Sequence, residues 1–144
     1  MKLSTKARYG LKACFTLALE PNKTHSLSEI STKTGVTPAY LDQIFRLLKK
    51  DGIVQSERGV QGGYVLAHAP EEITIGQVTR ALEDNLEIVD CLSGNICCAG
   101  FCPTHNVWKR LYDGINGILD SLTLADMVKD FEAQSQFHDK EKKG

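Results

Sequence analysis

The sequence lacks the features that mark membrane proteins and several common classes of enzyme. No apolar run is long enough to span a bilayer, and residues 1–4 contain no apolar signal region. We therefore expect a cytoplasmic protein whose thiols are kept reduced. The motifs Gly-x-Gly-x-x-Gly, Gly-x4-Gly-Lys-Ser/Thr, Gly-x-Ser-x-Gly and His-Glu-x-x-His are missing, and His25, His68 and His138 lie far apart in the chain. These absences predict that the protein is not an enzyme.

The net charge of -1 conceals an uneven distribution of charge along the 144 residues. Residues 1–70 hold ten Lys and Arg against five Asp and Glu, a net charge of +5. Residues 71–144 hold seven against thirteen, a net charge of -6. A basic N-terminal half joined to an acidic C-terminal half predicts that the first half meets a polyanion such as DNA.

Four of the five cysteines fall in the stretch 91–105, in the pattern Cys91-x5-Cys97-x4-Cys102-x2-His105. This density of soft ligands indicates a metal-binding loop. Structural zinc sites usually use close Cys-x2-Cys pairs, which this stretch does not contain, whereas a glycine-containing loop with spaced thiolates suits an iron–sulfur cluster. An imidazole in place of one thiolate would raise the potential of the cluster and make it responsive to protonation, which favours a sensor over an electron carrier.

Different roles for these cysteines stay open. A zinc site or a bare thiol switch would use the same residues, whereas two disulfides would leave a fifth cysteine over. Cys14 has a different role. It lies in an apolar row with Ala7, Leu11 and Ala18, on a first helix that Ser4 can cap, so we expect it to be a small core residue.

The next segment predicts a helix-turn-helix. Ser26 and Glu29 form a capping box for a short second helix, and Gly35 stands where a helix C-terminus needs a left-handed residue. Thr37 and Pro38 follow as the N-cap and first-turn proline of a third helix. A short helix, a tight glycine turn and a second capped helix are typical of this DNA-binding motif.

The outward residues of the third helix are predicted to recognise DNA. The alternative is an ordinary polar face exposed to solvent. Its inward stripe consists of Leu41, Ile44, Phe45 and Leu48. Its outward residues are Ala39, Tyr40, Asp42, Gln43, Arg46 and Lys50. Gln43 can pair with adenine, Arg46 with guanine or phosphate, and the Tyr40 hydroxyl with phosphate. Phosphates would repel Asp42 unless it accepts a hydrogen bond from cytosine, so Asp42 is a candidate specificity residue.

A β-hairpin follows this helix. Residues 53–56 and 64–67 are predicted to be two strands joined by a glycine-rich tip. A hairpin directly after a helix-turn-helix makes a winged helix, whose tip lies against the DNA backbone or the minor groove, where an arginine is attracted by the negative potential. The predicted contacts at the tip are Arg58, Gly59, Gln61 and Gly62.

The C-terminal half predicts a dimer. Thr74 and Gln77 form a capping box for a fourth helix that ends near Glu83, and Thr104 can cap a long helix that begins at His105. The apolar residues of the long helix repeat at steps of three and four, as in the seam of two packed helices. We prefer dimerisation to packing on the chain's own domain, because a helix that projects from a small domain has little else to bury against. The seam residues are Trp108, Leu111, Ile115, Ile118 and Leu122.

The expected fold class is mainly α with a small β-hairpin wing. Residues 1–83 form a winged helix-turn-helix DNA-binding domain, and residues 84–104 form the cluster-binding loop. Residues 105–132 form the dimerisation helix and a final short helix that ends near Phe131. The polar residues 133–144 are expected to be a disordered tail.

Four stretches carry a family resemblance: residues 1–9 (MKLSTKARY), 40–45 (YLDQIF) and 58–64 (RGVQGGY), and the cysteine and histidine pattern of 91–105. Together they resemble the iron–sulfur cluster regulator (IscR) family of bacterial winged-helix transcription factors. The resemblance implies a homodimer that binds a palindromic promoter site on double-stranded DNA, senses iron–sulfur status and controls genes of iron–sulfur cluster biogenesis.

The resemblance also implies one 2Fe-2S cluster per subunit. Its ligands would be Cys91, Cys97, Cys102 and His105. The family more often places five residues between the second and third cysteines, whereas here four follow Cys97 and three follow Cys98. Cys98 is therefore the alternative to Cys97, which preserves the first interval.

The alternatives to an iron–sulfur-sensing regulator are other branches of the same family and one unrelated class of protein. In a similar nitric-oxide-sensing branch a first-helix aspartate binds the cluster, and the matching position here is Arg8, which argues against that branch. A thiol-redox sensing repressor or a repressor of cysteine metabolism would have the same fold, although the latter typically lacks the cysteine set. A small iron–sulfur electron-transfer protein would leave the basic half and the wing unexplained.

Overall fold

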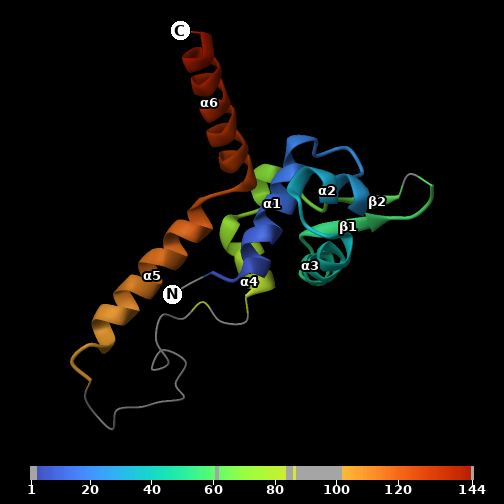
Figure 1. Ribbon diagram of the computed structural model, residues 1–144. Helices are drawn as coiled ribbons and strands as arrows, with labels where there is room; N and C mark the ends of the chain where they lie inside the picture. The colour runs from blue at the N-terminus through green and yellow to red at the C-terminus, as the bar shows by residue number, and fades with distance from the viewer. Residues whose placement is uncertain (1–2, 61, 84–85, 87–101, 144) are drawn as a thin grey trace.

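The computed structural model describes residues 3–60, 62–83, 86 and 102–143, and confirms a mainly helical chain with one antiparallel hairpin. Figure 1 shows a compact group made by the first four helices and the hairpin, from which the last two helices extend in different directions. The elements in chain order are α1 (Thr5–Leu19), α2 (Leu27–Thr34), α3 (Pro38–Lys50), β1 (Val54–Glu57), β2 (Gly63–Leu66), the 3-10 turn η1 (Pro70–Glu72), α4 (Ile75–Leu82), α5 (His105–Ser121) and α6 (Leu124–Lys143).

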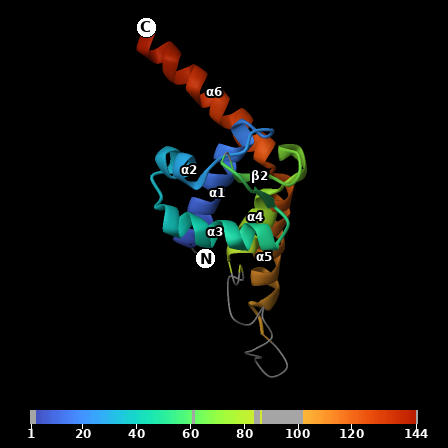
Figure 2. The same ribbon diagram turned by 90° about the vertical axis from the view of Figure 1, so that its right-hand side faces the viewer.

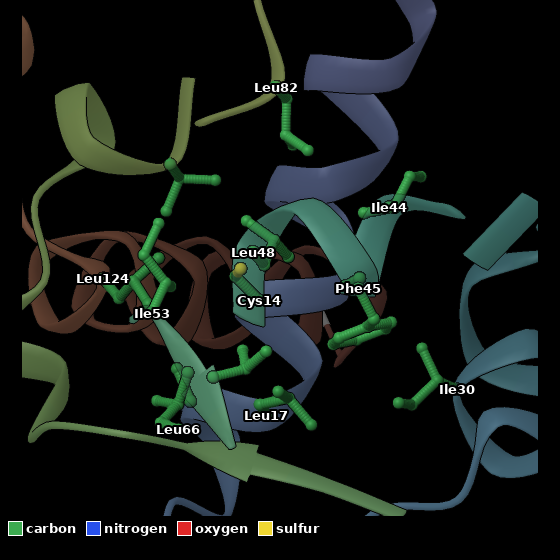
Figure 3. Close-up of a cluster of buried hydrophobic side chains, with 14 of the residues drawn as sticks. Cys14, Leu17, Ile30, Ile44, Phe45, Leu48, Ile53, Leu66, Leu82 and Leu124 are labelled. Atoms are coloured by element: carbon green, nitrogen blue, oxygen red, sulfur yellow. The ribbon is translucent and has the colours of Figure 1, made fainter. Parts of the chain in front are cut away.

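The hydrophobic core lies between α1, α3, α4 and the hairpin. Figure 3 shows Cys14 and Leu17 of α1 facing Phe45 and Leu48 of α3, and all four side chains are buried. Burial raises the pKa of the Cys14 thiol to about 12, so this cysteine stays protonated and unreactive. The prediction that Cys14 is a core residue is confirmed.

Most predicted helix starts are confirmed by hydrogen bonds. The hydroxyl groups of Ser4, Ser26 and Thr37 accept hydrogen bonds from backbone amides of the first turns of α1, α2 and α3. A reciprocal capping box begins α4 at Thr74, as predicted. At α2 only half of the predicted box forms, because the Glu29 carboxylate accepts from the ammonium groups of Lys23 and Lys33 instead.

The hairpin is held against α3 and against the loop that precedes α2. Val54 pairs with Leu66 at one end of the ladder and Glu57 with Gly63 at the other. The Tyr64 ring stacks on Phe45 of α3 with ring centroids 4.5 Å apart. Tyr64 also exchanges two backbone hydrogen bonds with His25, in the loop that precedes α2. The wing therefore has a fixed position relative to α3.

The last helix is longer than the sequence predicts. Instead of ending near Phe131, α6 continues to Lys143, through residues expected to be a disordered tail. Residues 133–143 contain no Gly or Pro, and seven of these eleven residues are Ala, Gln, Glu or Lys, which favour helix. The prediction relied on polarity, which indicates exposure to solvent but does not distinguish an exposed helix from a coil.

Candidate nucleic-acid interface and metal loop

Helix α3 presents the predicted polar face on the outside of the domain. The inward stripe is buried as predicted, while Ala39, Gln43, Arg46 and Lys50 are exposed. Thr37 begins the helix, with its hydroxyl 3.3 Å from the Tyr40 amide. An exposed polar face on a capped helix, held by four buried apolar residues, is the geometry that a recognition helix needs to enter a major groove.

Two of the predicted base-reading residues are paired with each other. The Arg46 Nε lies 3.0 Å from Asp42 Oδ2 in an ion pair, and the Arg46 side chain is 77% exposed. The remaining guanidinium N–H groups are therefore accessible to a ligand. Because Arg46 partly compensates the charge of Asp42, the pair lowers the repulsion between this carboxylate and DNA phosphates.

Tyr64 is a candidate site residue that was not among the predicted DNA contacts, although it lies in a predicted strand and in the stretch 58–64 that carries the family resemblance. Its hydroxyl end lies close enough to Asp42 and Arg46 for their charges to act on it. The pKa of Tyr64 is raised chiefly by burial and further by Asp42, while Arg46 lowers it. The wing and the recognition helix thus meet at this tyrosine.

Tyr40 is only partly buried and makes an edge-on ring contact with Tyr9 of α1. The ring centroids are 6.0 Å apart, and the Lys12 ammonium lies 6.0 Å from the centre of the Tyr9 ring. The first and third helices therefore place two phenols and a cation beside the start of the recognition face. The role of Tyr40 in phosphate binding stays a prediction.

The tip of the wing is exposed to solvent. Gly59 has a φ of 117, which favours glycine, and its carbonyl accepts from the Gly62 amide at 3.0 Å. Arg58 is exposed, as is the whole side chain of Val60, which was not among the predicted contacts; Gln61 lies outside the described residues.

Two side-chain hydrogen bonds hold the base of the wing. Lys49 Nζ of α3 donates to Ser56 Oγ of β1 at 2.7 Å, and Thr24 Oγ1 donates to Glu57 Oε2 at 2.5 Å. The first bond connects the wing to the end of the recognition helix, and the second connects it to the loop before α2. Both favour a wing that moves together with α3.

Only the end of the predicted metal loop falls within the described residues. Cys91, Cys97 and Cys98 lie outside them, so their positions stay predictions. Cys102 and His105 are described, and both are partly exposed at the N-terminal end of α5. The His105 amide donates to the Cys102 carbonyl at 3.4 Å, which places a thiol and an imidazole on one turn.

The chemistry of these two groups suits a metal. The Cys102 Sγ lies 3.4 Å from the Thr104 hydroxyl, and this hydroxyl makes no capping hydrogen bond to α5, contrary to the prediction. A helix N-terminus carries a partial positive charge that stabilises a thiolate, and a thiolate and a neutral imidazole are the soft and borderline donors that iron and zinc prefer. The two described donors therefore fit a cluster or a zinc ion.

The start of this loop is tied to the first helix by a contact that no local pattern in the chain predicts. The Ser4 backbone amide donates to Glu83 Oε1 at 2.5 Å, across 79 positions of the chain. Glu83 immediately follows α4, at the point where the chain leaves toward the predicted ligands. The contact joins the beginning of that segment to the N-terminus of α1.

The long helix α5 exposes an apolar strip, but with a different composition from the predicted seam. Leu111, Ile118 and Leu122 are exposed as expected, and Val107 joins them at 51% exposure. Gly114 lies between Leu111 and Ile118 in this strip, and a Cβ added to it would meet no atom within 4 Å. Trp108 and Ile115, which the prediction placed in the same seam, are partly buried.

No helix in the described ranges is both long enough and apolar enough to cross a membrane.

Comparisons with known proteins agree with this geometry. The family model for Rrf2, described as an iron-dependent transcriptional regulator, matches residues 3–130. The HTH-type transcriptional regulator IscR of Aliivibrio salmonicida is 36% identical over 136 residues, covering 93% of this chain and 81% of the relative.

Two solved structures share the fold over nearly the whole chain. T. potens IscR is 40% identical with a TM-score of 0.76, covering 93% of this chain and 91% of that one. CymR (YrzC), the global cysteine regulator of B. subtilis, is 34% identical with a TM-score of 0.79, covering 90% and 97%. The predicted resemblance to IscR is confirmed, and the relatives are transcriptional regulators rather than enzymes. The chain belongs to the Rrf2 family of transcriptional regulators.

Proposed function

We propose that the protein is a homodimeric, DNA-binding regulator that senses iron–sulfur status through one 2Fe-2S cluster per subunit. Its targets are promoters of iron–sulfur cluster biogenesis genes, and it acts in the cytoplasm, where those promoters are. The observation that carries the proposal is the position of His105, the first residue of the helix that exposes the apolar strip, with Cys102 three residues before it. A ligand bound there would contact the element through which two copies associate.

The donors of the cluster would be Cys91, Cys97, Cys102 and His105, with Cys98 as the alternative to Cys97. When bound, a cluster of this kind supplies reversible one-electron chemistry and sensitivity to iron supply. The residues of this chain hold the two ends of the loop. Glu83 fixes its start against α1, and His105 fixes its end as the first residue of α5.

A second copy of the chain is the proposed occupant of the α5 strip. Val107, Leu111, Ile118 and Leu122 are spaced by four, seven and four residues, and Gly114 lies between them. Val107, Leu111, Gly114 and Ile118 follow the steps of four, three and four of an a/d seam, Leu122 lies just past the end of α5, and the glycine allows close approach. In the monomer these side chains are exposed to water, so their burial would drive association.

The proposed dimer places two recognition helices on one palindromic site. Half-sites on one face of DNA lie roughly 34 to 36 Å apart. The exposed face of α3 would enter the major groove, with Gln43, Arg46 and Asp42 toward base edges, and Tyr40 and Lys50 toward phosphates. The wing tip, with Arg58, would lie on the backbone or in the minor groove.

Repression of cysteine metabolism is the second candidate, because the structure of CymR matches with a TM-score of 0.79. That function would need no cluster. The cysteines of residues 91–102 would then be structural or act as a thiol switch. A nitric-oxide sensor is less consistent with Arg8, at the position where that branch has an aspartate ligand.

Metal analysis of protein purified without oxygen tests the proposal. About two irons and two sulfides per chain, with visible absorption, are expected. Cys102→Ser and His105→Ala should reduce the iron content, and comparison of Cys97→Ser with Cys98→Ser should show which of these two cysteines is the ligand. Cys14→Ala is the matched control, since this thiol lies in the core. A chain without iron would contradict the cluster and favour the CymR-like function.

Promoter binding is the second part of the test. The expected result is a change in affinity for a promoter fragment between the cluster-loaded protein and the Cys102→Ser variant. If the two bind every tested promoter equally, the coupling of the cluster to DNA binding is wrong, although the cluster itself would stand.

A further inference from the structure

Helix α5 is attached to the winged domain near its C-terminal end. None of its side chains is buried, and α4 is the element of the described chain against which it chiefly packs. Figures 1 and 2 show its N-terminal half extending away from the domain while its C-terminal end lies beside α4. The orientation of the whole helix therefore depends on a small group of contacts around residues 116–122.

The centre of this attachment is a forked interaction of Arg80. Its Nη1 donates to Asp120 Oδ1 at 2.6 Å and its Nη2 to Asp120 Oδ2 at 3.1 Å. The same Nη2 donates to Asn116 Oδ1 at 2.7 Å, one turn earlier on α5. The guanidinium is planar, so a bidentate bond to one residue and a third bond to the next turn fix the rotation of α5 as well as its distance. The hydrogen bond from Arg80 also lowers the pKa of Asp120, which favours its ionised form.

Gly76 of α4 lies directly against the Arg80–Asp120 pair and the end of α5. A Cβ built at Gly76 of α4 would collide with Asp120 Oδ1 and would lie 3.3 Å from the Leu119 carbonyl carbon. Gly76 therefore permits the close approach that brings Arg80 within reach of α5.

Two backbone hydrogen bonds also join the turn after α5 to the segment at the start of α4. The Ile75 amide donates to the Leu122 carbonyl at 2.8 Å, and the Leu124 amide donates to the Ile73 carbonyl at 2.9 Å. These bonds hold the end of α5 in place, but they lie at one point along the helix and leave its tilt to the side chains.

We propose that Arg80, Asp120 and Asn116 form an orientation joint that sets the angle between the winged domain and α5, and thereby the spacing of the two recognition helices. The proposal rests on the proposed homodimer and on its DNA binding. Arg80 acts here as a positioning residue, since it lies on α4 and is not part of the recognition face. Helix α4 packs against both α1 and α3, so a change of angle at the joint moves the recognition helix with it.

Because α5 is long, a small change in its tilt displaces its far end by several ångströms. With 17 residues, α5 is about 25 Å long. A tilt of about 10° displaces the far end of such a helix by about 4 Å, which is about one base-pair step of 3.4 Å. In the sequence, Arg80 precedes the predicted metal loop, and Asn116 and Asp120 follow it.

The alternative role for this contact is that of an exposed ion pair that only adds a little stability. Arg80 and Asp120 are 40% and 52% exposed, and exposed pairs typically contribute little. The two roles differ in their consequence for DNA. A stabilising pair would affect all operators equally, whereas a joint would affect the dependence of affinity on half-site spacing.

The test measures affinity of the full-length protein for duplexes that differ in spacer length by one base pair at a time. The duplexes are built from a palindromic site selected by the wild-type protein from random-sequence DNA. The wild type should show a sharp optimum. Arg80→Met should lower affinity at that optimum by about tenfold and broaden or shift the profile, with unchanged affinity for a single half-site. Arg80→Lys, which keeps the charge but not the fork, should behave like Arg80→Met.

Lys109→Met is the matched control. It removes a similar exposed ion pair, between Lys109 Nζ and Asp113 Oδ2 at 2.7 Å, that lies wholly within α5. Its spacing profile should be that of the wild type. An unchanged profile for Arg80→Met, or an equal loss of affinity at every spacing and on the half-site, would overturn the joint. A wild-type chain that sediments as a monomer or binds no DNA would instead show that the proposed function fails, and the joint with it.

Discussion

At the scale of single residues, the one carboxylate of α3 belongs to Asp42, and its ion pair with Arg46 determines how it can interact with DNA. Asp42 is held by Arg46 at 3.0 Å, so the two side chains present a donor and an acceptor side by side. Such a pair can match the edges of a guanine and a cytosine, with Arg46 donating to guanine and Asp42 accepting from the cytosine amino group.

Asp42→Ala should relax sequence preference at one base pair without a general loss of affinity. The lost discrimination is expected to be about 1–3 kcal/mol, because the removed acceptor is the group that distinguishes cytosine. Affinities for operators with every single-base change would show it. Asp51→Ala is the control, since it removes an exposed carboxylate just beyond the end of α3. An equal change on all operators, as expected for Asp51→Ala, would contradict the assignment.

Glu29 makes the stability of the domain dependent on pH. The hydrogen bond from Lys23, followed by that from Lys33, lowers the pKa of Glu29 from 4.5 to about 2. A carboxylate with a depressed pKa in the folded state stabilises it at pH values above about 4.5, and this contribution is lost as the pH falls toward 2. Glu29→Gln should therefore lower the free energy of unfolding at pH 7, and the difference from the wild type should shrink in acid.

Urea unfolding at a series of pH values measures this difference. Glu71→Gln, which changes an exposed carboxylate of η1, serves as the control and should follow the wild-type curve. A difference between Glu29→Gln and the wild type that stays constant from pH 7 to pH 2 would show that the ion pairs of Glu29 are not its cause.

At the scale of elements, the position of the wing depends on one glycine. A Cβ at Gly63 would collide with the His25 carbonyl oxygen and lie 2.8 Å from the Ser26 amide nitrogen. Both atoms belong to backbone, which cannot rotate away. Gly63→Ala should therefore separate β2 from the loop before α2, at a cost of about 1–3 kcal/mol in stability, and it should weaken DNA binding by displacing the wing.

Thermal unfolding and operator affinity together check this prediction. The fold should survive, because most of the core side chains lie on α1, α3 and α4. Unchanged melting temperature and affinity would mean that the hairpin and the loop adjust without consequence, and that the wing does not need this contact.

Local signals explain why the elements of the domain could be predicted. Caps at Ser4, Thr37 and Thr74, and the left-handed Gly35, act within one turn of the chain, so their effect can be recognised in the sequence alone. The inward stripe of α3 follows from helical periodicity. The course of α6 beyond Phe131 could not be predicted in this way, because the polarity of residues 132–143 indicates exposure to solvent and does not distinguish an exposed helix from a coil.

The parts of the candidate site that were missed all depend on contacts between distant segments. Tyr64 reaches the pair on α3 only because the hairpin folds back onto Phe45. The Ser4–Glu83 contact spans 79 positions, and Arg80 meets Asp120 across 40. Spacing along the chain carries no signal for such pairs. The identities of Cys102 and His105 as candidate ligands, by contrast, followed from residue type and short spacing.

At the scale of the whole molecule, the exposed strip of α5 predicts the oligomeric state. Leu111→Asp together with Ile118→Asp should give a folded monomer, since both side chains are exposed in the single chain and their loss costs the domain little. A charge in the seam should prevent association. Sedimentation would measure the state. Phe137→Asp, which alters an apolar side chain of α6 that is 70% exposed, is the control outside the strip.

If the double variant remained a dimer, the interface would lie elsewhere and the strip would need another partner. If it became a monomer, affinity for the full palindrome should fall far more than affinity for a half-site. The reason is that the second recognition helix gains its effective concentration from the first through the dimer.

The dependence of DNA affinity on salt concentration should report how many phosphate contacts the dimer makes. The positive charge of residues 1–70 should release counterions from DNA, so the logarithm of affinity should fall linearly with the logarithm of salt concentration. Each phosphate contact contributes about 0.9 to that slope. A symmetric dimer has two wings, and Arg58→Ala should therefore reduce the slope by about two contacts. Lys142→Ala, on the exposed far end of α6, should leave the slope unchanged. A reduction by a single contact would mean that only one wing touches DNA, which a palindromic complex with two equivalent half-sites does not allow.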